Sequence, residues 1–281
     1  VASNSRISSF QAILSMATWF GKLVLDLLGV GRDVALASTF LAILQQCHSS
    51  GSSARISYQT AGALVLLHLM NIPVMALGIY SPPFVLPPGS PMLVDVAGVV
   101  MAILCAYYLS QRHMIKTYEQ ERDDFGVQIF ERFNCLPKRG VLRHRPVAAA
   151  TIFYSVVIVS AAVWNSVSGR RPSMKSYCAS FQEVLGALAL LPQIWMFHKE
   201  KRAPKCLAYL VLLVVGSRMC MVSYFTLQPF VLGRAVYLSR AMQTVGQETM
   251  FILIFADFLY FFARSTAHGH KEIVLEMTSC V

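Results

Sequence analysis

The sequence predicts an all-α integral membrane protein with seven transmembrane helices, arranged 3+1+3 as two parallel three-helix repeats joined by one helix. Three observations predict this fold class. Charged residues make up 14% of the 281 residues and hydrophobic residues 56%, whereas a soluble domain carries roughly 25% charged residues. Seven apolar segments are each long enough to cross a bilayer, which takes about 20 residues. The third observation is an internal repeat at a constant offset.

The seven predicted spans follow from the apolar runs and the polar turns between them. They lie near 25–46, 59–80, 91–111, 146–166, 178–198, 206–227 and 241–263. The fifth contains Pro192 followed by Gln193. Proline bends a membrane helix and frees a backbone carbonyl, and a glutamine in lipid needs a partner on another helix. We therefore expect this span to be kinked, with Gln193 as a structural polar group.

Outside the spans, the chain divides into an arm, one long loop and a tail. Residues 1–24 form the N-terminal arm, in which Phe10–Phe20 reads as an interfacial helix, and 25–264 form the membrane domain. The loop 112–145 is the longest connection, and 265–281 form the tail. The loops after spans one, three and five hold, with the tail, 15 Lys and Arg, against 6 on the other side. The positive-inside rule then makes the N-terminus lumenal and the tail cytosolic.

The internal repeat relates the first spans to the last ones. AILQQ (42–46) aligns with ALLPQ (189–193), and the same offset of 147 aligns GALVLLHLMN (62–71) with YLVLLVVGSR (209–218). Parallel repeats occur in membrane transporters, where the binding site lies between the repeats near the midplane. In this register Asn71 is equivalent to Arg218, so each half is predicted to direct one polar side chain into a shared cavity.

Ionisable residues inside the predicted spans are candidate site residues, because a charge in a membrane helix costs a few kcal/mol. Arg218 is the leading candidate for a ligand-binding cation. The alternative is a purely structural salt bridge from Arg218 to Glu183 or Asp257. Arg32 and Asp33 form either a pair at a helix end that reaches toward the membrane surface or the floor of a cavity.

Two further groups of polar residues lie in the spans. His68 lies three residues before Asn71 on the same helical face, either as a pH-sensing group or as a neutral structural histidine. Asp95, near a helix start, is expected to be a solvated cap or a partner of the helix dipole.

The first half of the seventh predicted segment carries four polar residues, namely Arg240, Gln243, Gln247 and Glu248. The spacing 240, 243, 247 places one stripe on a single helix face, which is expected to point into the bundle. Arg240 is thereby a further ligand-binding candidate.

The sequence contains no motif of a hydrolase, zinc protease or nucleotide-binding enzyme, so we expect no enzyme activity. The seven cysteines are scattered and never spaced C-x-x-C, so neither a disulfide framework, a metal site nor a cofactor is expected. The net charge of +10 lies in short loops between apolar runs, which indicates membrane topology rather than nucleic-acid binding. Guanidinium and hydrogen-bonding groups suit an anionic or polar ligand.

Four stretches of the chain resemble the ER lumen protein-retaining receptor (KDEL receptor) family, itself similar to the PQ-loop and SWEET transporters. They are 54–60 (ARISYQT), 114–130 (MIKTYEQERDDFGVQIF), 183–195 (EVLGALALLPQIW) and 256–269 (ADFLYFFARSTAHG). The resemblance covers about 25–268 and departs at an insertion around 131–145. It implies a multi-pass receptor of ER and Golgi membranes that binds lumenal proteins by KDEL- or HDEL-like C-terminal tails. Vesicle coat machinery on the cytosolic side and membrane lipids are the other implied partners.

The resemblance keeps only part of the family's site. Asp33, Arg218 and Asp257 match the family residues, whereas other family positions are occupied here by Gly29, Leu36, Asn71, Val74, Gly186, Ser217 and Gln228. Glu183 lies one turn from the position of a family glutamate and could substitute for it. Ser217 and Asn71 are expected beside Arg218 in the ligand site. Three functions stay open: a retrieval receptor with an altered signal preference, a small-solute carrier of the PQ-loop type, and a relative that has lost peptide binding.

Overall fold

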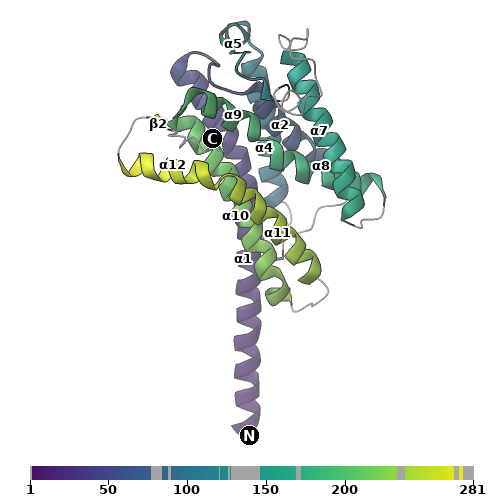
Figure 1. The fold of residues 1–281 in the computed structure, drawn as a ribbon. Coiled ribbons are helices and arrows are strands. Elements are labelled where there is room, and N and C mark those ends of the chain that lie inside the picture. Colours follow the sequence, from purple (N-terminus) through teal and green to yellow (C-terminus); the bar gives the residue numbers. More distant parts are fainter. Residues whose placement is uncertain are drawn as a thin grey trace.

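The computed structural model describes residues 2–76, 84–87, 90–119, 121–125, 127, 146–168, 172–232, 238–268 and 272–274. These residues are helical almost throughout, with one pair of short strands (Figure 1). The helices are α1 (Ala2–Ser50), α2 (Tyr58–Leu69), α3 (Asn71–Ala76), α4 (Ser90–Leu109), α5 (Arg112–Thr117), α7 (Pro146–Val167), α8 (Met174–Leu188), α9 (Leu191–Glu200), α10 (Lys205–Leu232), α11 (Leu238–Ile254) and α12 (Ala256–Ala267). The all-helical fold class predicted from the sequence is therefore present.

Four described helical segments are long and apolar enough to cross a membrane, namely Thr18–Ser50, Ser90–Leu109, Ala149–Val167 and Lys205–Leu232. The pair α11 and α12, bent by 51°, makes a fifth if it is counted as one span. The chain thus has the character of a helical membrane protein. The count of seven stays a prediction, because it requires the two shorter broken pairs, α2–α3 and α8–α9, to cross as well.

The breaks in these helices have local causes. Pro192 lies in the first turn of α9, where a proline costs no hydrogen bond because its missing N–H would have no intrahelical acceptor. The predicted interruption of the fifth span is thus present, between Leu188 and Leu191. At its other end α9 stops at Lys201, whose φ of 56° is left-handed.

Packing centres on α1, which runs along α10 and α4. Helix α10 also packs against α11, α7 against α8, and α2 against α4, α8 and α9. The N-terminal part of α1 projects beyond the other helices (Figure 1). Helix α1 runs from Ala2 to Ser50 without a break, so it includes residues of both the predicted N-terminal arm and the first predicted span.

A pair of antiparallel strands, β1 (Arg202–Pro204) and β2 (Glu272–Val274), was not predicted from the sequence. Ala203 lies opposite Ile273 in this pair, and both side chains are buried. The strand from the tail is thereby attached to the turn between α9 and α10.

Candidate functional site

A cavity of about 460 Å³ lies between α1, α2, α3, α4, α8, α10 and α11. Its described lining includes seven carboxylate or guanidinium side chains: Asp26, Arg32, Asp33, Asp95, Glu183, Arg218 and Glu248. Five are carboxylates and two are guanidiniums. Carboxylates therefore outnumber guanidiniums in the described lining.

Arg218, on α10, is paired with a carboxylate of the neighbouring helix α11. Its Nη1 donates to both carboxylate oxygens of Glu248, at 2.9 and 3.0 Å. The side chains are 14% and 4% exposed, so the pair is largely shielded from solvent. Gly186 faces this pair from α8, and a Cβ added there would collide with the Arg218 guanidinium. The glycine therefore makes room for the arginine.

The second guanidinium is on α1. Arg32 Nε donates to Asp33 Oδ1 at 2.6 Å, and Arg32 Nη1 lies 3.5 Å from the sulfur of Met221 on α10. Both residues of the pair line the cavity. Of the two alternatives drawn from the sequence, the cavity position is the one observed.

Three polar side chains connect α3, α4 and α8 across the cavity. The Asn71 amide donates to Asp95 Oδ1 at 3.0 Å, and Gln182 Nε2 donates to Asn71 Oδ1 at 2.6 Å. Asp95 is 6% exposed and lies inside α4 rather than at its start. The prediction of a solvated cap was wrong, since the side chain points into the bundle.

Asp26 holds one wall of the cavity in place. Its two oxygens accept backbone N–H bonds from Phe84, Val85 and Leu86, at 2.9, 2.7 and 3.0 Å. Hydrogen bonds from backbone N–H groups to a carboxylate are charge-assisted and therefore strong. This short segment is thus attached to α1 beside the site.

Two more predicted residues face the cavity with different partners. Glu183 Oε2 accepts a bond from Trp164 Nε1 at 2.9 Å. His68 is 4% exposed, and its Nδ1 lies 3.0 Å from the carbonyl of Leu64. A carbonyl can only accept, so Nδ1 carries a proton and Nε2 of the neutral ring is an acceptor.

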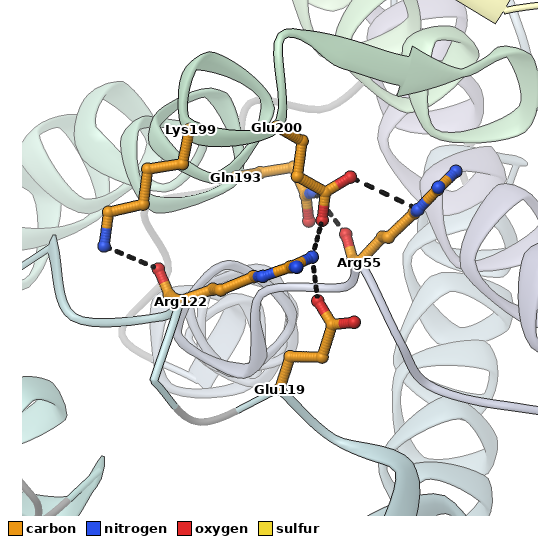
Figure 2. A network of polar contacts seen from close by, with 6 residues as sticks. All are labelled: Arg55, Glu119, Arg122, Gln193, Lys199 and Glu200. Carbon is orange, nitrogen blue, oxygen red and sulfur yellow. Dashed lines mark hydrogen bonds and ion pairs between the residues drawn. The ribbon is translucent and has the colours of Figure 1, made fainter.

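A second polar cluster, here called the loop network, lies where the ends of α1, α2 and α9 meet (Figure 2). Gln193 accepts from the backbone N–H of Ser57 and donates to the carbonyl of Arg55, both at 2.8 Å. Glu200, with its side chain 8% exposed, forms ion pairs with Arg55 at 3.2 Å and with Arg122 at 2.8 Å. Figure 2 shows the two arginines reaching the same carboxylate from different loops.

Beside the loop network lies a buried carboxylate without an arginine partner among the described residues. Asp123 Oδ1 accepts from the Ser57 hydroxyl at 2.8 Å, and Oδ2 from the Tyr118 hydroxyl at 2.5 Å and the Gln59 N–H at 3.2 Å. Burial raises the pKa of Asp123, and these hydrogen bonds oppose the rise. These contacts hold Tyr118 and Asp123 against the start of α2.

The structure brings most of the predicted ligand-site residues together. Arg218, Asn71, Ser217, Arg32 and Asp33 all line the cavity. The Ser217 hydroxyl donates to the carbonyl of Val214 at 2.6 Å, so that proton is not available to a ligand. The sixth candidate, Arg240, is within α11, but its side chain lies outside the described residues.

Three other predictions need correction or relocation. The partner of Arg218 is Glu248, neither Glu183 nor Asp257. Asp257 is exposed on α12 and does not line the cavity. By contrast, Gln193, expected as a structural polar group, has its partners in the loop network. Along α11 the stripe was placed one residue out.

The predicted inward stripe on α11 is wrong because the helix is rotated differently from the expectation. Gln243 is exposed and Gln247 is partly exposed, whereas Glu248 is 3% exposed and turned inward. The choice between these faces depends on how α11 is rotated against α10, and spacing alone does not determine that rotation. Asp26, Trp164 and Gln182 were also missed, although an acidic residue at the start of an apolar run was a usable signal for Asp26.

No curated protein matches this chain. A family model described as ER lumen protein retaining receptor matches residues 52–228. The matched region begins before α2 and ends within α10, so it includes the cavity walls formed by α2, α3, α4 and α8. It covers more than half of the chain. The protein therefore belongs to the ER lumen protein-retaining receptor family.

Proposed function

We propose that this protein is a multi-pass receptor that binds C-terminal retention signals of lumenal proteins and returns these proteins from the Golgi to the ER. The observation that carries the proposal is the family match over residues 52–228 together with a polar cavity inside the helical bundle. A cavity of about 460 Å³ is within the range of known small-ligand sites, ~300–1,000 Å³. This is room for a few residues of a peptide.

The packing supports the predicted 3+1+3 arrangement. The repeat relates the first predicted span, within α1, to the fifth, which contains α8. It also relates the second predicted span, which contains α2, to the sixth, which is α10. The contact between α1 and α10 therefore corresponds to the contact between α8 and α2. Both contacts are present. The equivalent residues Asn71 and Arg218 also line one cavity, as expected where parallel repeats meet. In this proposal seven spans cross the membrane, the N-terminus is lumenal, and the loop network faces the cytosol and the coat machinery.

A small-solute carrier is the second candidate, and one observation favours it. The helical path breaks at Met70, between α2 and α3, and the next residue, Asn71, lines the cavity. Interrupted helices at a midplane site are typical of transporters. Flux of sugars or amino acids into proteoliposomes would support this candidate, whereas peptide binding without flux supports the receptor.

The direct test is binding of the purified protein to C-terminal tetrapeptides, KDEL and HDEL among them, at about pH 5.5 and 7.4, which straddle the ordinary histidine pKa of ~6.5. Each peptide is compared with its C-terminal amide. Binding that requires the free carboxylate supports a receptor for C-terminal tails. If no free-acid peptide binds better than its amide at either pH, the proposal is wrong.

A further inference from the structure

The register of α1 against α10 shows where the lining residues lie along the cavity. A Cβ added at Gly21 would come within 2.9 Å of Val231, and Arg32 Nη1 lies 3.5 Å from the sulfur of Met221. Residue numbers rise along α1 where they fall along α10, so the two helices are antiparallel. Asp26 is therefore level with the part of α10 that lies between Met221 and Val231.

The level of Asp26 is the open end of the cavity. Phe84, whose N–H donates to Asp26 at 2.9 Å, lines the cavity with its side chain 41% exposed. At the other end, Ser217 and His68 are 1% and 4% exposed, and the His68 ring packs 4.8 Å from that of Phe40, far along α1. A ligand therefore enters past Phe84, and in the proposed orientation this mouth faces the lumen.

The distance between the two ends limits how much of a tail the cavity holds. The lining on α1 extends from Asp26 to Leu36, which is ~15 Å at about 1.5 Å per helical residue. An extended peptide advances ~3.4 Å per residue, so roughly four residues fit between the closed end and the mouth. Because a C-terminal tail is attached to a folded protein, its chain must leave through the mouth. The residue before the last four then lies beside Phe84.

The segment 84–87, here called the strap, is fixed at both ends. Asp26 accepts the backbone N–H groups of Phe84, Val85 and Leu86. The N–H and the hydroxyl of Ser90 both donate to the Pro87 carbonyl at 2.9 Å, which attaches the strap to the start of α4. The Phe84 ring is thus positioned at the mouth by backbone contacts before a ligand arrives, and a positioned side chain loses little freedom on binding.

Aromatic side chains gather at this mouth. Tyr224 and Phe225 of α10 line the cavity together with Phe84, and the ring centroids of the first two are 5.3 Å apart in an edge-to-face arrangement. Aromatic rings attract one another in edge-to-face and offset arrangements, beyond the gain from burying apolar area. The mouth therefore suits an aromatic side chain of a ligand.

We propose that Phe84 is a specificity-determining residue of this receptor, which contacts the ligand residue directly before the four-residue signal and favours an aromatic side chain there. Asp26 is the positioning residue that holds the strap, and thereby Phe84, at the mouth. The inference rests on the proposed function, because it requires a C-terminal tail as the ligand.

The test is a binding measurement on the full chain in detergent micelles at about pH 5.5 and 7.4. The probes are the pentapeptides FKDEL and GKDEL and the C-terminal amide of GKDEL. All are acetylated at the N-terminus, so that no ammonium group stands where the chain of a lumenal protein would continue. FKDEL should bind roughly threefold or more tightly than GKDEL, the size of one aromatic contact.

The outcomes separate this inference from the proposed function. Equal binding of FKDEL and GKDEL, with GKDEL tighter than its amide, would overturn the role of Phe84 and leave the tail receptor standing. If GKDEL binds no better than its amide, or if no peptide binds, the ligand is not a C-terminal tail and both statements are wrong.

Three variants locate the contact through the affinity ratio of FKDEL to GKDEL. Phe84→Ala should bring the ratio close to that of equal binding, whereas Phe84→Tyr keeps the ring and should keep the ratio. The matched control is Phe230→Ala on α10, at a side chain that is 79% exposed and outside the described lining; it should change the ratio by less than about twofold. An unchanged ratio in Phe84→Ala, or an equal loss in the control, would refute the contact.

Asp26→Ala tests the positioning role. It leaves the Phe84 ring in the chain but removes the acceptor of three strap N–H groups, so the ratio should fall as it does in Phe84→Ala. A ratio equal to that of the wild type would show that the strap does not need Asp26. Because both peptides are measured on the same sample, a partial loss of folded protein lowers both signals and leaves the ratio of affinities intact.

Discussion

The pair of Arg218 and Glu248 gives the sharpest prediction for stability. In Arg218→Ala, the Glu248 carboxylate, 4% exposed, loses the guanidinium that bonds both of its oxygens. An uncompensated buried charge of this kind costs roughly 3–5 kcal/mol. For a domain of about 150–250 residues, 1 kcal/mol corresponds to ~2–4 °C in Tm, so the variant should unfold on the order of 10 °C below the wild type.

The double variant Arg218→Met with Glu248→Leu separates charge pairing from packing. It removes both charges and fills the space with apolar groups, and replacing a buried ion pair in this way is often close to neutral. We expect its Tm to lie within about 4 °C of the wild type, well above that of Arg218→Ala. A matched control is Arg122→Ala, whose side chain is 49% exposed. That variant should lose about 1 kcal/mol or less.

The assay uses cysteines that the fold protects. Cys47, Cys105 and Cys178 are free and buried, so a thiol-reactive fluorophore reports their exposure as the purified protein is heated. A Tm of Arg218→Ala within about 2 °C of the wild type would refute the reasoning. A double variant as unstable as the single one would show that packing around the pair, rather than its charge, sets the loss.

Three further predictions concern other buried polar groups. Gln193→Ala removes the partner of the Ser57 N–H and of the Arg55 carbonyl, and it should lower the free energy of unfolding by roughly 2–4 kcal/mol. The control Gln45→Ala, at an exposed position of α1, should lower it by under about 0.5 kcal/mol. Thermal unfolding of the two variants measures the difference. Asp26→Ala should release the segment 84–86 and expose it to proteolysis, and equal cleavage of wild type and variant would contradict this. Burial raises the pKa of Asp123 above its ordinary value of 3.8, so the folded state binds this proton more tightly than the unfolded state does. The bound proton therefore stabilises the folded state at acid pH, and this stabilisation is lost as the pH rises through the folded-state pKa. Unfolding between about pH 4 and 7 should show that slope, and Asp123→Asn should flatten it.

The helical fold was predictable because it depends on the length and composition of apolar runs. The runs 91–111, 146–166 and 206–227 each correspond to one helix of similar extent, α4, α7 and α10. The breaks were harder to predict. Pro192 in the first turn of α9 and Pro73 in the first turn of α3 mark two of them in the sequence, whereas the 51° bend before Ala256 has no proline beside it.

The site was predictable as a set of residues but not as a set of pairs. Arg218 and Asn71 were found because intramembrane polar residues are rare and costly. The partner of Arg218 depends on the rotation of α11 about its axis, and a shift of one position along a helix turns a side chain by ~100°. An error of one position in the rotation of α11 is therefore enough to turn Glu248 inward in place of Gln243 and Gln247, which were predicted to face the bundle. The net charge of the cavity depends on which side chains turn inward, Asp26 and Glu248 among them, so it could not be read from the candidates alone.

The short strand pair has a mechanical consequence for the tail. Three residues of β2 are held in register against β1, and β1 follows directly on the left-handed residue Lys201. A pull on the tail would therefore load the turn between α9 and α10 as well as the end of α12. Because Arg55 and Arg122 hold Glu200, the last residue of α9, that tension would continue into the loops that precede α2 and follow α5. A tether attached beyond β2 should thus report on the whole end of the bundle rather than on one helix.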